Sequence, residues 1–464
     1  MYKSAINKLN IRQLICKYLL LVVLMLCSLS TWSQESSTVI KQPEPRIAKW
    51  QNDKYGMFIH WGLYAIPGWH EQHQWRLNVP REEYVKLKEQ WNPEKFNPDA
   101  ILDVLLKSGM KYLTFTVKHH DGFCLWDTKQ TNYNTMNTPY GKDILKMLTD
   151  ACHRRKVPIH LYYSVVDWNN PTYPNQGKSH ELQPQPNDTP DQAKYTQFVK
   201  NQITELCTNY GEIAGIWWDG YRFDLKDTSV NNIIRRLQPN AVINNRGFDE
   251  GDFSTPERNY DKDEERSFKN PTEACQSVGM ESWGYRLNED YYNDVFLIRS
   301  IDKYLSRGAN YLLNVSLDAK GVMPQQSKTV LKNIGKWYNQ VKESFYNAES
   351  VNALTTNQNV MLTRKGKVLY VHLNHEPEGN VVKLRPFTQA PKSATLLNTG
   401  EKVDFELVLA PQDHLVKKKY LRLINLPTNK YSNTVLVIKL EFDKLPEEFY
   451  KLNQQKEVIN EKQK

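Results

Sequence analysis

The chain repeats one pattern: a short apolar run, a polar cluster at its end, and then a segment long enough for a helix. The apolar runs with their polar ends fall at 54–62, 111–122, 157–164, 215–220 and 241–247. This order predicts a parallel β-sheet, because the crossover between parallel strands is usually a helix. An open doubly wound sheet gathers its site at one switch point, whereas here every run ends in polar residues. We therefore predict an α/β protein with a TIM-like (β/α) catalytic barrel.

Helix signals occupy the segments between these runs. Asn97 stands directly before a proline, as is typical of a helix N-terminus. Other helices are predicted to begin at Pro80 and to span 143–155, 191–210 and 231–237. These lengths suit the crossovers of a barrel.

The pattern changes past about residue 343. Short β runs at 360–364, 367–373, 393–397 and 434–440, separated by Asn, Gly and Pro turns, predict an antiparallel β-sandwich. We expect four parts in the chain: a signal peptide at 1–33, the catalytic barrel at 34–345, the C-terminal β-sandwich at 346–445 and a charged tail at 446–464.

The N-terminus is typical of a secretory signal. Basic residues precede the apolar run 18–29, and small polar residues follow it up to Ser33, where we expect cleavage. The protein should then be periplasmic or extracellular, with no membrane span. A lipoprotein anchored at Cys27 is disfavoured, because the bulky Leu26 precedes that residue. Cleavage removes four basic and no acidic residues, so the formal charge falls from +9 to +5, which does not argue for nucleic acid.

Four cysteines would remain after cleavage, and they are scattered without CxxC spacing: Cys124, Cys152, Cys207 and Cys275. This arrangement argues against a zinc site, and a chain of this size needs no disulfide framework, so we expect buried free thiols. The sequence has no GxGxxG, P-loop or GxSxG motif. We expect neither a metal nor an organic cofactor.

The run Gly215-Ile-Trp-Trp-Asp-Gly220 ends in a lone carboxylate. A buried strand here would deliver Asp219 to the carboxyl end of the sheet, where barrel enzymes keep their catalytic groups. Two tryptophans beside a carboxylate suit a sugar pocket, because an indole face can stack on the apolar face of a pyranose. The alternative is a structural strand that ends in a turn-forming Asp-Gly pair.

A retaining glycosidase needs a second carboxyl group, about 5–5.5 Å from the nucleophile and able to protonate the leaving oxygen. The region after Arg246 supplies the candidates Glu250, Glu257, Glu264, Glu265, Glu273 and Glu281. Most stand among other charges, as surface residues do. Glu273 lies in a less charged segment bounded by aromatic residues, where a carboxyl group is easier to keep protonated. It is the favoured acid/base.

The pair His119-His120 superficially resembles a metal site. Adjacent strand residues point to opposite sides, so the pair could not hold one ion without a bend. No HExxH motif or third ligand at standard spacing accompanies it. Hydrogen bonding to sugar hydroxyls is favoured over a buried structural role, and a metal is least favoured. His60 is interpreted in the same way, and Arg246 either orients a carboxylate or makes an ordinary ion pair.

Six segments together resemble glycoside hydrolase family 29, the retaining α-L-fucosidases. They occur in the family's order over about residues 45–345, and the C-terminal sandwich also fits the family. The segments are Phe58-Ile-His-Trp-Gly62, Lys118-His-His-Asp-Gly-Phe123, Trp217-Trp-Asp-Gly220, Asn245-Arg-Gly247, Ser282-Trp-Gly-Tyr285 and Gly308-Ala-Asn-Tyr-Leu-Leu-Asn314. Each is weak alone, but the set is highly specific.

The resemblance implies roles for two carboxylates. Asp219 occupies the family's nucleophile position, and Glu273 stands nine residues before Ser282, as the acid/base glutamate does in many members. Thr272 replaces the tryptophan that often precedes that glutamate, and acid/base positions vary within the family. The alternatives for the acid/base are Glu281 and Glu257.

The resemblance also implies a fucose pocket, formed by His60, Glu71, His119, His120, Tyr162, Trp217 and Arg246. Glu71 keeps the acidic position of a Glu-Trp pair that usually follows the first strand, whereas Gln72 replaces the tryptophan. Either Trp69 or Trp75 then restores the stacking surface, or the rim of the site differs from that of the family.

These residues predict a retaining α-L-fucosidase that releases terminal α-L-fucosyl units from glycans or oligosaccharides through a covalent fucosyl-enzyme. One alternative is a related retaining exo-glycosidase, such as an α-L-galactosidase, and another is an inactive carbohydrate-binding homologue. The linkage preference is expected to depend on loops outside the fucose pocket, such as 169–188. The sequence assigns no oligomeric state.

Overall fold

The computed structural model describes residues 44–220, 227–258, 266–385, 387, 389–409, 411, 414, 415, 417 and 419–444. All of these except Glu44 belong to one compact unit, Pro45–Lys464. The predicted signal peptide at 1–33, with Cys27, and the predicted tail at 446–464 lie outside the described residues. Within the described ranges, no helix combines the length and apolar character that a membrane crossing requires.

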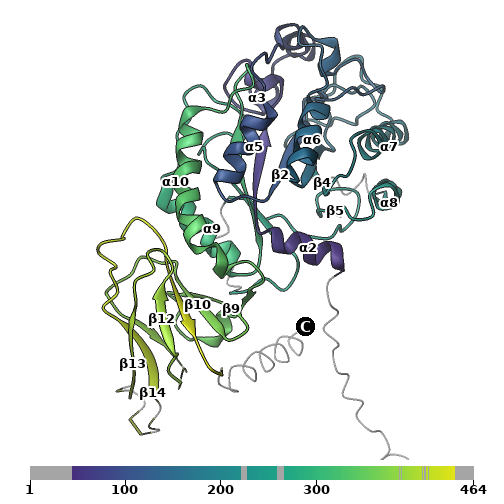
Figure 1. The fold of residues 1–464 in the computed structure, drawn as a ribbon. Helices are drawn as coiled ribbons and strands as arrows, with labels where there is room; N and C mark the ends of the chain where they lie inside the picture. Colours follow the sequence, from purple (N-terminus) through teal and green to yellow (C-terminus); the bar gives the residue numbers. More distant parts are fainter. Residues whose placement is uncertain are drawn as a thin grey trace, which may run out of the picture. The chain divides into compact units, whose positions relative to one another are not determined.

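Seven parallel strands form one curled sheet, in the order β5-β4-β3-β2-β1-β7-β6 (Figure 1). The strands are β1 Tyr55–His60, β2 Tyr112–Lys118, β3 Ile159–Ser164, β4 Gly215–Asp219, β5 Val242–Ile243, β6 Glu273–Ser277 and β7 Asn310–Ser316. Because all seven are parallel, their carboxyl ends lie at the same edge of the sheet.

The segment 253–257 links the two edges of this sheet through isolated parallel bridges. Phe253 pairs with Asn244, directly after β5, and Glu257 pairs with Cys275 in β6. The segment therefore lies between the edge strands, an arrangement consistent with a closed (β/α) barrel.

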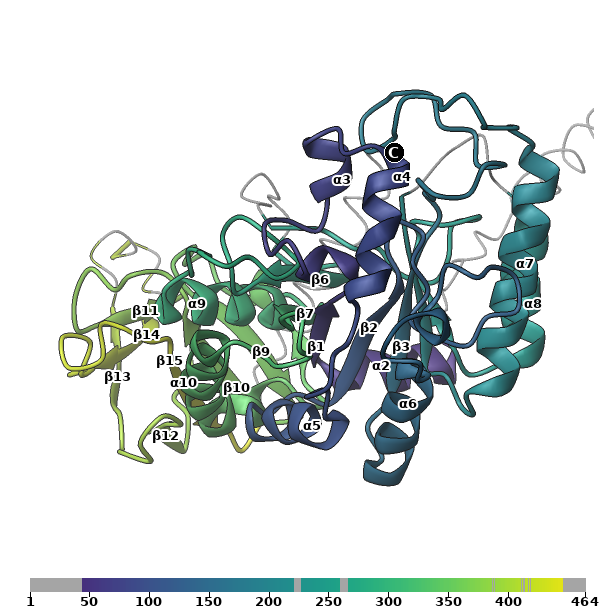
Figure 2. The same cartoon turned by 90° about the horizontal axis from the view of Figure 1, so that it is seen from above.

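Helices occupy the connections between the strands, and Figures 1 and 2 show α5, α6, α7 and α8 along the outside of β2 to β5. The helices are α2 Pro45–Asp53, α3 His73–Arg76, α4 Arg81–Tyr84, α5 Pro98–Lys107, α6 Ile144–Arg155, α7 Gln192–Asn209, α8 Thr228–Leu237, α9 Asp294–Ser306 and α10 Gln325–Val341. Short 3-10 turns lie at Leu63–Ala65, Val85–Gln90, Thr135–Asn137, Lys342–Ser344 and Asn352–Leu354.

Side-chain caps set the starts of several helices. Asn97, Asp143 and Asp191 each accept a hydrogen bond from a backbone N–H in the first turn of α5, α6 and α7, which confirms the predicted helix starts. Helix α8 begins at Thr228, earlier than predicted, because Asp227 caps it in the same way.

Two apolar layers lie on either side of the curled sheet. The larger one packs the outer face of the sheet against the helices. A smaller cluster fills the interior and includes Phe58, Tyr162 and Trp217. Trp50 of α2 joins this cluster, and its carbonyl oxygen accepts a hydrogen bond from Asn310, the first residue of β7. Trp50 therefore covers the interior at the amino ends of the strands.

Two antiparallel sheets follow, shown in yellow-green in Figure 1, in the orders β12-β15-β10-β9-β8 and β11-β14-β13. Their strands are β8 Glu349–Ser350, β9 Met361–Lys365, β10 Val368–Leu373, β11 Val382–Leu384, β12 Ser393–Leu396, β13 Asp404–Leu409, β14 Lys419–Ile424 and β15 Leu436–Glu441. Both sheets contribute to one buried apolar cluster. Strands β9, β10, β12 and β15 match the predicted β runs, whereas β8, β11, β13 and β14 were not expected.

Candidate active site

The polar ends of the parallel strands meet at a pocket of about 1410 Å³. Asp219 is the last residue of β4 and His60 is the last residue of β1, so both stand at the carboxyl edge of the sheet. Eight of the nine site residues predicted from the sequence line this pocket: His60, Glu71, His119, His120, Tyr162, Trp217, Asp219 and Arg246.

Two donors hold the carboxylate of Asp219. The Tyr162 hydroxyl donates to Oδ2 over 2.6 Å, and Nη1 of Arg246 lies 3.3 Å from Oδ1. Burial alone would raise the pKa of Asp219, but His120, Arg246 and the Tyr162 hydroxyl outweigh it and hold the pKa below its ordinary value. Asp219 is therefore ionised near neutral pH, as a carboxylate nucleophile must be. Its side chain remains 22% exposed, so a ligand in the pocket can reach it.

The guanidinium of Arg246 links Asp219 to a second carboxylate. Nη1 lies 2.5 Å from Oε1 of Glu257 and 3.3 Å from Oδ1 of Asp219, so these two oxygens are separated by at most the sum, 5.8 Å. This limit accommodates the spacing of about 5–5.5 Å between the carboxyl groups of a retaining glycosidase. Thr255 fixes the guanidinium, because its hydroxyl and carbonyl oxygens accept from Nε and Nη2 over 2.6 Å each.

Asn314 orients the ring of His60. The Asn314 amide nitrogen donates to the carbonyl of Trp283 over 2.8 Å, so its Oδ1 faces Nδ1 of His60, 2.8 Å away, as an acceptor. Nδ1 then carries the proton and Nε2 is an acceptor. Burial is the main cause that lowers the pKa of His60, so the ring is neutral near neutral pH and can accept a hydrogen bond from a sugar hydroxyl.

His119 and His120 both line the pocket, with ring centroids 4.3 Å apart. Regular strand alternation would separate them, but β2 ends at Lys118 and its register with β3 shifts after Thr116. Burial lowers the pKa of His120 to about 4 and that of His119 well below its usual value. Both rings are therefore neutral, and His119 stacks on Tyr162 at 5.7 Å.

Glu71 anchors the segment that follows β6. Its Oε2 accepts hydrogen bonds from the Ser282 hydroxyl and from the backbone N–H groups of Trp283 and Gly284, over 2.7, 2.9 and 3.1 Å. Burial would raise the pKa of Glu71, but His70 and the bonds from Ser282 and Gly284 lower it below its ordinary value. Glu71 thus fixes one wall of the pocket as a carboxylate.

Phe58, Trp217 and Trp283 give the pocket an aromatic wall. The Phe58 ring lies 5.2 Å from that of Trp217 and 6.4 Å from that of Trp283, measured between centroids. Among the described residues, the lining includes neither Trp69 nor Trp75, the predicted stacking residues. Trp283 lines the pocket instead, and its presence in the Ser282–Tyr285 motif was the signal that could have identified it.

Glu273 lies apart from the other predicted site residues. It is the first residue of β6, at the amino end of the sheet, and only 1% of its surface is exposed. Trp217 Nε1 donates to its Oε1 over 3.0 Å, and the Tyr112 hydroxyl donates to its Oε2 over 2.5 Å. Of the residues with described positions, Glu273 is not among those lining the pocket. This geometry does not support Glu273 as the acid/base.

The remaining acidic candidates differ in whether they line the pocket. Glu250 and Glu257 line the pocket, whereas Glu281 is exposed and, within the described part of the chain, outside the lining. Glu264 and Glu265 lie outside the described residues. Of these residues, Glu257 accepts a hydrogen bond from Nη1 of Arg246, and the same nitrogen contacts Asp219.

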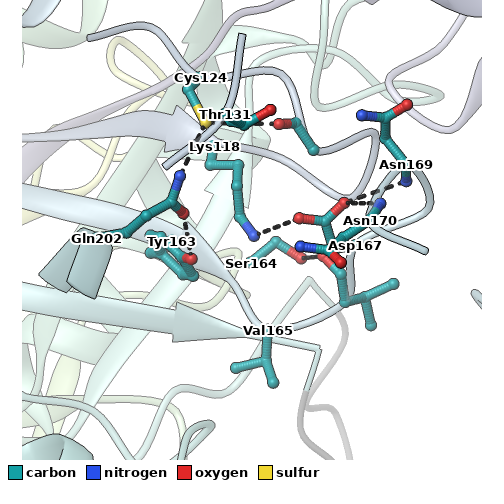
Figure 3. A network of polar contacts seen from close by, with 12 residues as sticks. Lys118, Cys124, Thr131, Tyr163, Ser164, Val165, Asp167, Asn169, Asn170 and Gln202 are labelled. Atoms are coloured by element: carbon teal, nitrogen blue, oxygen red, sulfur yellow. Dashed lines mark hydrogen bonds and ion pairs between the residues drawn. The ribbon is translucent and has the colours of Figure 1, made fainter. Parts of the chain in front are cut away.

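A buried ion pair holds the loop after β3 beside the pocket. Figure 3 shows Nζ of Lys118 directed at Asp167, and the distance to Oδ2 is 2.9 Å. Oδ1 of Asp167 accepts from the backbone N–H groups of Asn169 and Asn170, so one carboxylate ties the loop to β2. The ammonium also lies 4.3 Å from the ring centroid of Tyr163. The far part of this loop, 178–181, lines the pocket.

Four buried free cysteines, at positions 124, 152, 207 and 275, confirm the expected thiols. The described residues include no group of three or more His, Cys, Asp or Glu side chains placed to hold a metal ion. The pocket combines two carboxylates joined by one guanidinium with neutral histidines and an aromatic wall. This is the arrangement of a glycoside hydrolase.

Comparison with known proteins identifies the family. The family model for alpha-L-fucosidase matches residues 27–343, and the chain belongs to this family. The solved structure of alpha-L-fucosidase isoenzyme 1 from Paenibacillus thiaminolyticus is 32% identical and aligns with a TM-score of 0.76 over 86% of this chain and 99% of that chain. Tissue alpha-L-fucosidase of Bos taurus is 25% identical over 418 residues, which are 83% of this chain and 87% of that protein.

A third relative bears on the mechanism. It is a GH29 alpha-L-fucosidase from Bacteroides thetaiotaomicron, 27% identical, with a TM-score of 0.73 over 86% of this chain and 97% of that chain. Its structure holds a covalent intermediate, trapped with 2-fluoro-fucosyl fluoride in a Glu-to-Gln variant.

Breaking the buried ion pair should destabilise the protein. The side chains of Lys118 and Asp167 are 0% and 3% exposed, so Lys118→Met leaves an unpaired buried carboxylate. We expect a loss of about 3–5 kcal/mol, measured by urea unfolding. The matched control is the double variant Lys118→Met/Asp167→Asn, which also removes the carboxylate charge. It should regain most of the free energy of unfolding that Lys118→Met loses. Equal loss in both variants would contradict this account.

Glu273 should make stability depend on pH. Burial raises its pKa from 4.5 to about 7, so the folded protein binds this proton more tightly than the unfolded chain. The resulting stabilisation is complete below about pH 4.5 and is lost as pH rises through about 7, a change on the order of 3 kcal/mol. Relative to Glu273→Gln, the wild type should therefore lose stability between about pH 4.5 and pH 7. Parallel pH profiles for the two proteins would contradict this.

Proposed function

We propose that the protein is a retaining α-L-fucosidase with Asp219 as nucleophile and Glu257 as acid/base. The observation that carries this proposal is the pair of pocket carboxylates bonded to the same guanidinium nitrogen of Arg246. Support comes from membership of the alpha-L-fucosidase family and from the trapped covalent intermediate of the Bacteroides relative.

In the first step, a carboxylate oxygen of Asp219 attacks the anomeric carbon of a terminal α-L-fucosyl unit. The C–O bond to the leaving group breaks, and Glu257 transfers its proton to the departing oxygen. In the second step, Glu257 takes a proton from water, which attacks the same carbon and releases Asp219 as a carboxylate. Two inversions give net retention.

The pocket supplies the remaining interactions. We propose that the neutral rings of His60, His119 and His120 hydrogen bond to the sugar hydroxyls. Arg246 would keep the two carboxyl groups in place, and Glu71 would keep the wall of the pocket in place. The aromatic wall formed by Phe58, Trp217 and Trp283 suits the 6-methyl group, which favours an α-L-fucoside over an α-L-galactoside with its polar C6 hydroxymethyl group. The loop residues 178–181 line the same pocket, so we propose that they influence the linkage preference.

The chain can also be divided into a barrel, a β-sandwich and a removable N-terminal segment. We propose that the curled sheet and residues 253–257 form a closed TIM-like barrel, and that the two antiparallel sheets form a separate β-sandwich from about residue 346. The basic and apolar N-terminal pattern supports removal of residues 1–33 and a periplasmic or extracellular location.

Replacing the nucleophile should convert the enzyme to one that is rescued by azide. Asp219→Gly should lower kcat for aryl α-L-fucosides by roughly 10⁴-fold, because no covalent intermediate can form. Azide can enter the space left by the carboxylate and should give the inverted β-fucosyl azide, detectable by NMR. An α-azide from this variant would contradict the assignment of Asp219.

Replacing the acid/base should make the rate depend strongly on the leaving group. Glu257→Gln should lower kcat by roughly 10²–10⁴-fold for poor leaving groups, which need protonation, and far less for activated aryl fucosides. Azide should then attack the fucosyl-enzyme and give the α-fucosyl azide. Glu250→Gln, at another glutamate lining the pocket, is the matched control and should keep the wild-type dependence. A Glu257→Gln enzyme that hydrolyses a natural linkage at the parental rate would refute the assignment.

A further inference from the structure

Glu273 is a buried carboxyl group that the proposed mechanism does not use. Its two oxygens accept hydrogen bonds across the interior of the sheet, from Trp217 in β4 and Tyr112 in β2. A buried polar group is unfavourable unless it is hydrogen-bonded, and a hydrophobic residue would fill this place without that requirement. A carboxyl group at this position therefore differs from a hydrophobic residue in making these two directed hydrogen bonds.

The indole of Trp217 supports both groups that hold the nucleophile. The ring of Tyr162 stacks on it with centroids 5.6 Å apart and an interplanar angle of 19°, and the Tyr162 hydroxyl donates to Oδ2 of Asp219. The guanidinium carbon of Arg246 lies 5.0 Å from the indole centroid, and Nη1 contacts Oδ1 of Asp219. Each oxygen of Asp219 is thus held by a group that packs against this indole.

We propose that Glu273 is a positioning residue that fixes the indole of Trp217 and, through Tyr162 and Arg246, sets the position of the nucleophile. The proposal rests on the assignment of Asp219 as nucleophile in the proposed function. A strand fixes the backbone of Trp217 but not its side-chain torsions, and the bond from Nε1 to Glu273 sets the ring orientation. A displacement of a reacting group by about 1 Å can lower the rate by roughly a hundredfold.

A positioning role and an acid/base role predict different behaviour for two variants. The variant Glu273→Gln keeps an oxygen that accepts from Trp217 but has no acidic proton to donate. The variant Glu273→Leu removes both the hydrogen-bond acceptor and the acidic proton. For a positioning residue, Glu273→Gln should stay within about fivefold of wild-type kcat, and Glu273→Leu should fall by roughly tenfold to a hundredfold. The loss in Glu273→Leu should be equal for good and poor leaving groups, because the nucleophile is displaced for every substrate.

A double-mutant cycle tests whether the effect passes through the indole. Trp217→Phe removes the Nε1 donor and keeps an aromatic ring, so Glu273→Leu should add little further loss in the Trp217→Phe background. Tyr112→Phe removes the other donor to Glu273 and spares the Trp217 bond, so as the matched control it should change kcat by less than threefold.

The experiment measures kcat and KM for aryl α-L-fucosides of graded leaving-group ability, with and without azide, after circular dichroism has confirmed that each variant is folded. If Glu273→Leu does not fold, the leaving-group dependence and the azide product of Glu273→Gln still decide the question. The proposal is overturned if Glu273→Gln loses activity selectively on poor leaving groups or yields α-fucosyl azide, or if the effects of Glu273 and Trp217 multiply. Failure of the proposed function would instead show in the wild type and Asp219→Gly, which do not alter Glu273.

Discussion

The contact of Arg246 with two carboxylates is the interaction on which the candidate site depends. If both carboxyl groups were ionised, their charges about 5 Å apart would repel each other by roughly 3 kcal/mol at an effective dielectric constant of 20. Arg246 offsets this repulsion, and the two bonds to Thr255 keep the guanidinium between Asp219 and Glu257. The buried histidines are neutral, so near neutral pH the lasting positive charge next to Asp219 comes from Arg246.

The parallel sheet places these groups through the alternation of side chains along each strand. In β4, Trp217 and Asp219 face the interior, whereas Trp218 between them points outward and its Nε1 donates to Asn231 in α8. Gly220 follows with a φ of 74°, so the chain can turn away directly after the carboxylate. One strand thereby supplies the proposed nucleophile, the indole beneath it and an anchor to the surrounding helices.

Sequence patterns predicted the parts of this site that depend on local order. Asp219, His60 and the histidine pair each follow an apolar run, so their place at the carboxyl edge follows from strand direction. Glu273 was placed incorrectly relative to these residues, because Glu273–Ser277 reads Glu-Ala-Cys-Gln-Ser and does not show the apolar run of a buried strand. The residue begins a strand at the opposite edge of the sheet.

Glu257 lines the pocket, although its sequence surroundings predict a surface residue. Its neighbours in the sequence are charged, as on a solvated surface, but residues 253–257 pair with Asn244 and Cys275 on both sides and end at the pocket. Such long-range pairing leaves no periodic signal in five residues. Strand β13 is only partly buried along its length, whereas β14 buries Leu421 and Leu423, and Lys419 and Arg422 interrupt its apolar run.

The most direct test of this account is peptide mass spectrometry of the Glu257→Gln enzyme after reaction with 2-fluoro-fucosyl fluoride. This reagent carries an activated leaving group, so the first step needs no acid, and the missing base slows hydrolysis of the intermediate. The account predicts a persistent 2-fluorofucosyl adduct on the peptide that contains Asp219. An adduct on a peptide with a different carboxylate, or a Glu257→Gln enzyme that clears the adduct as fast as the wild type, would contradict it.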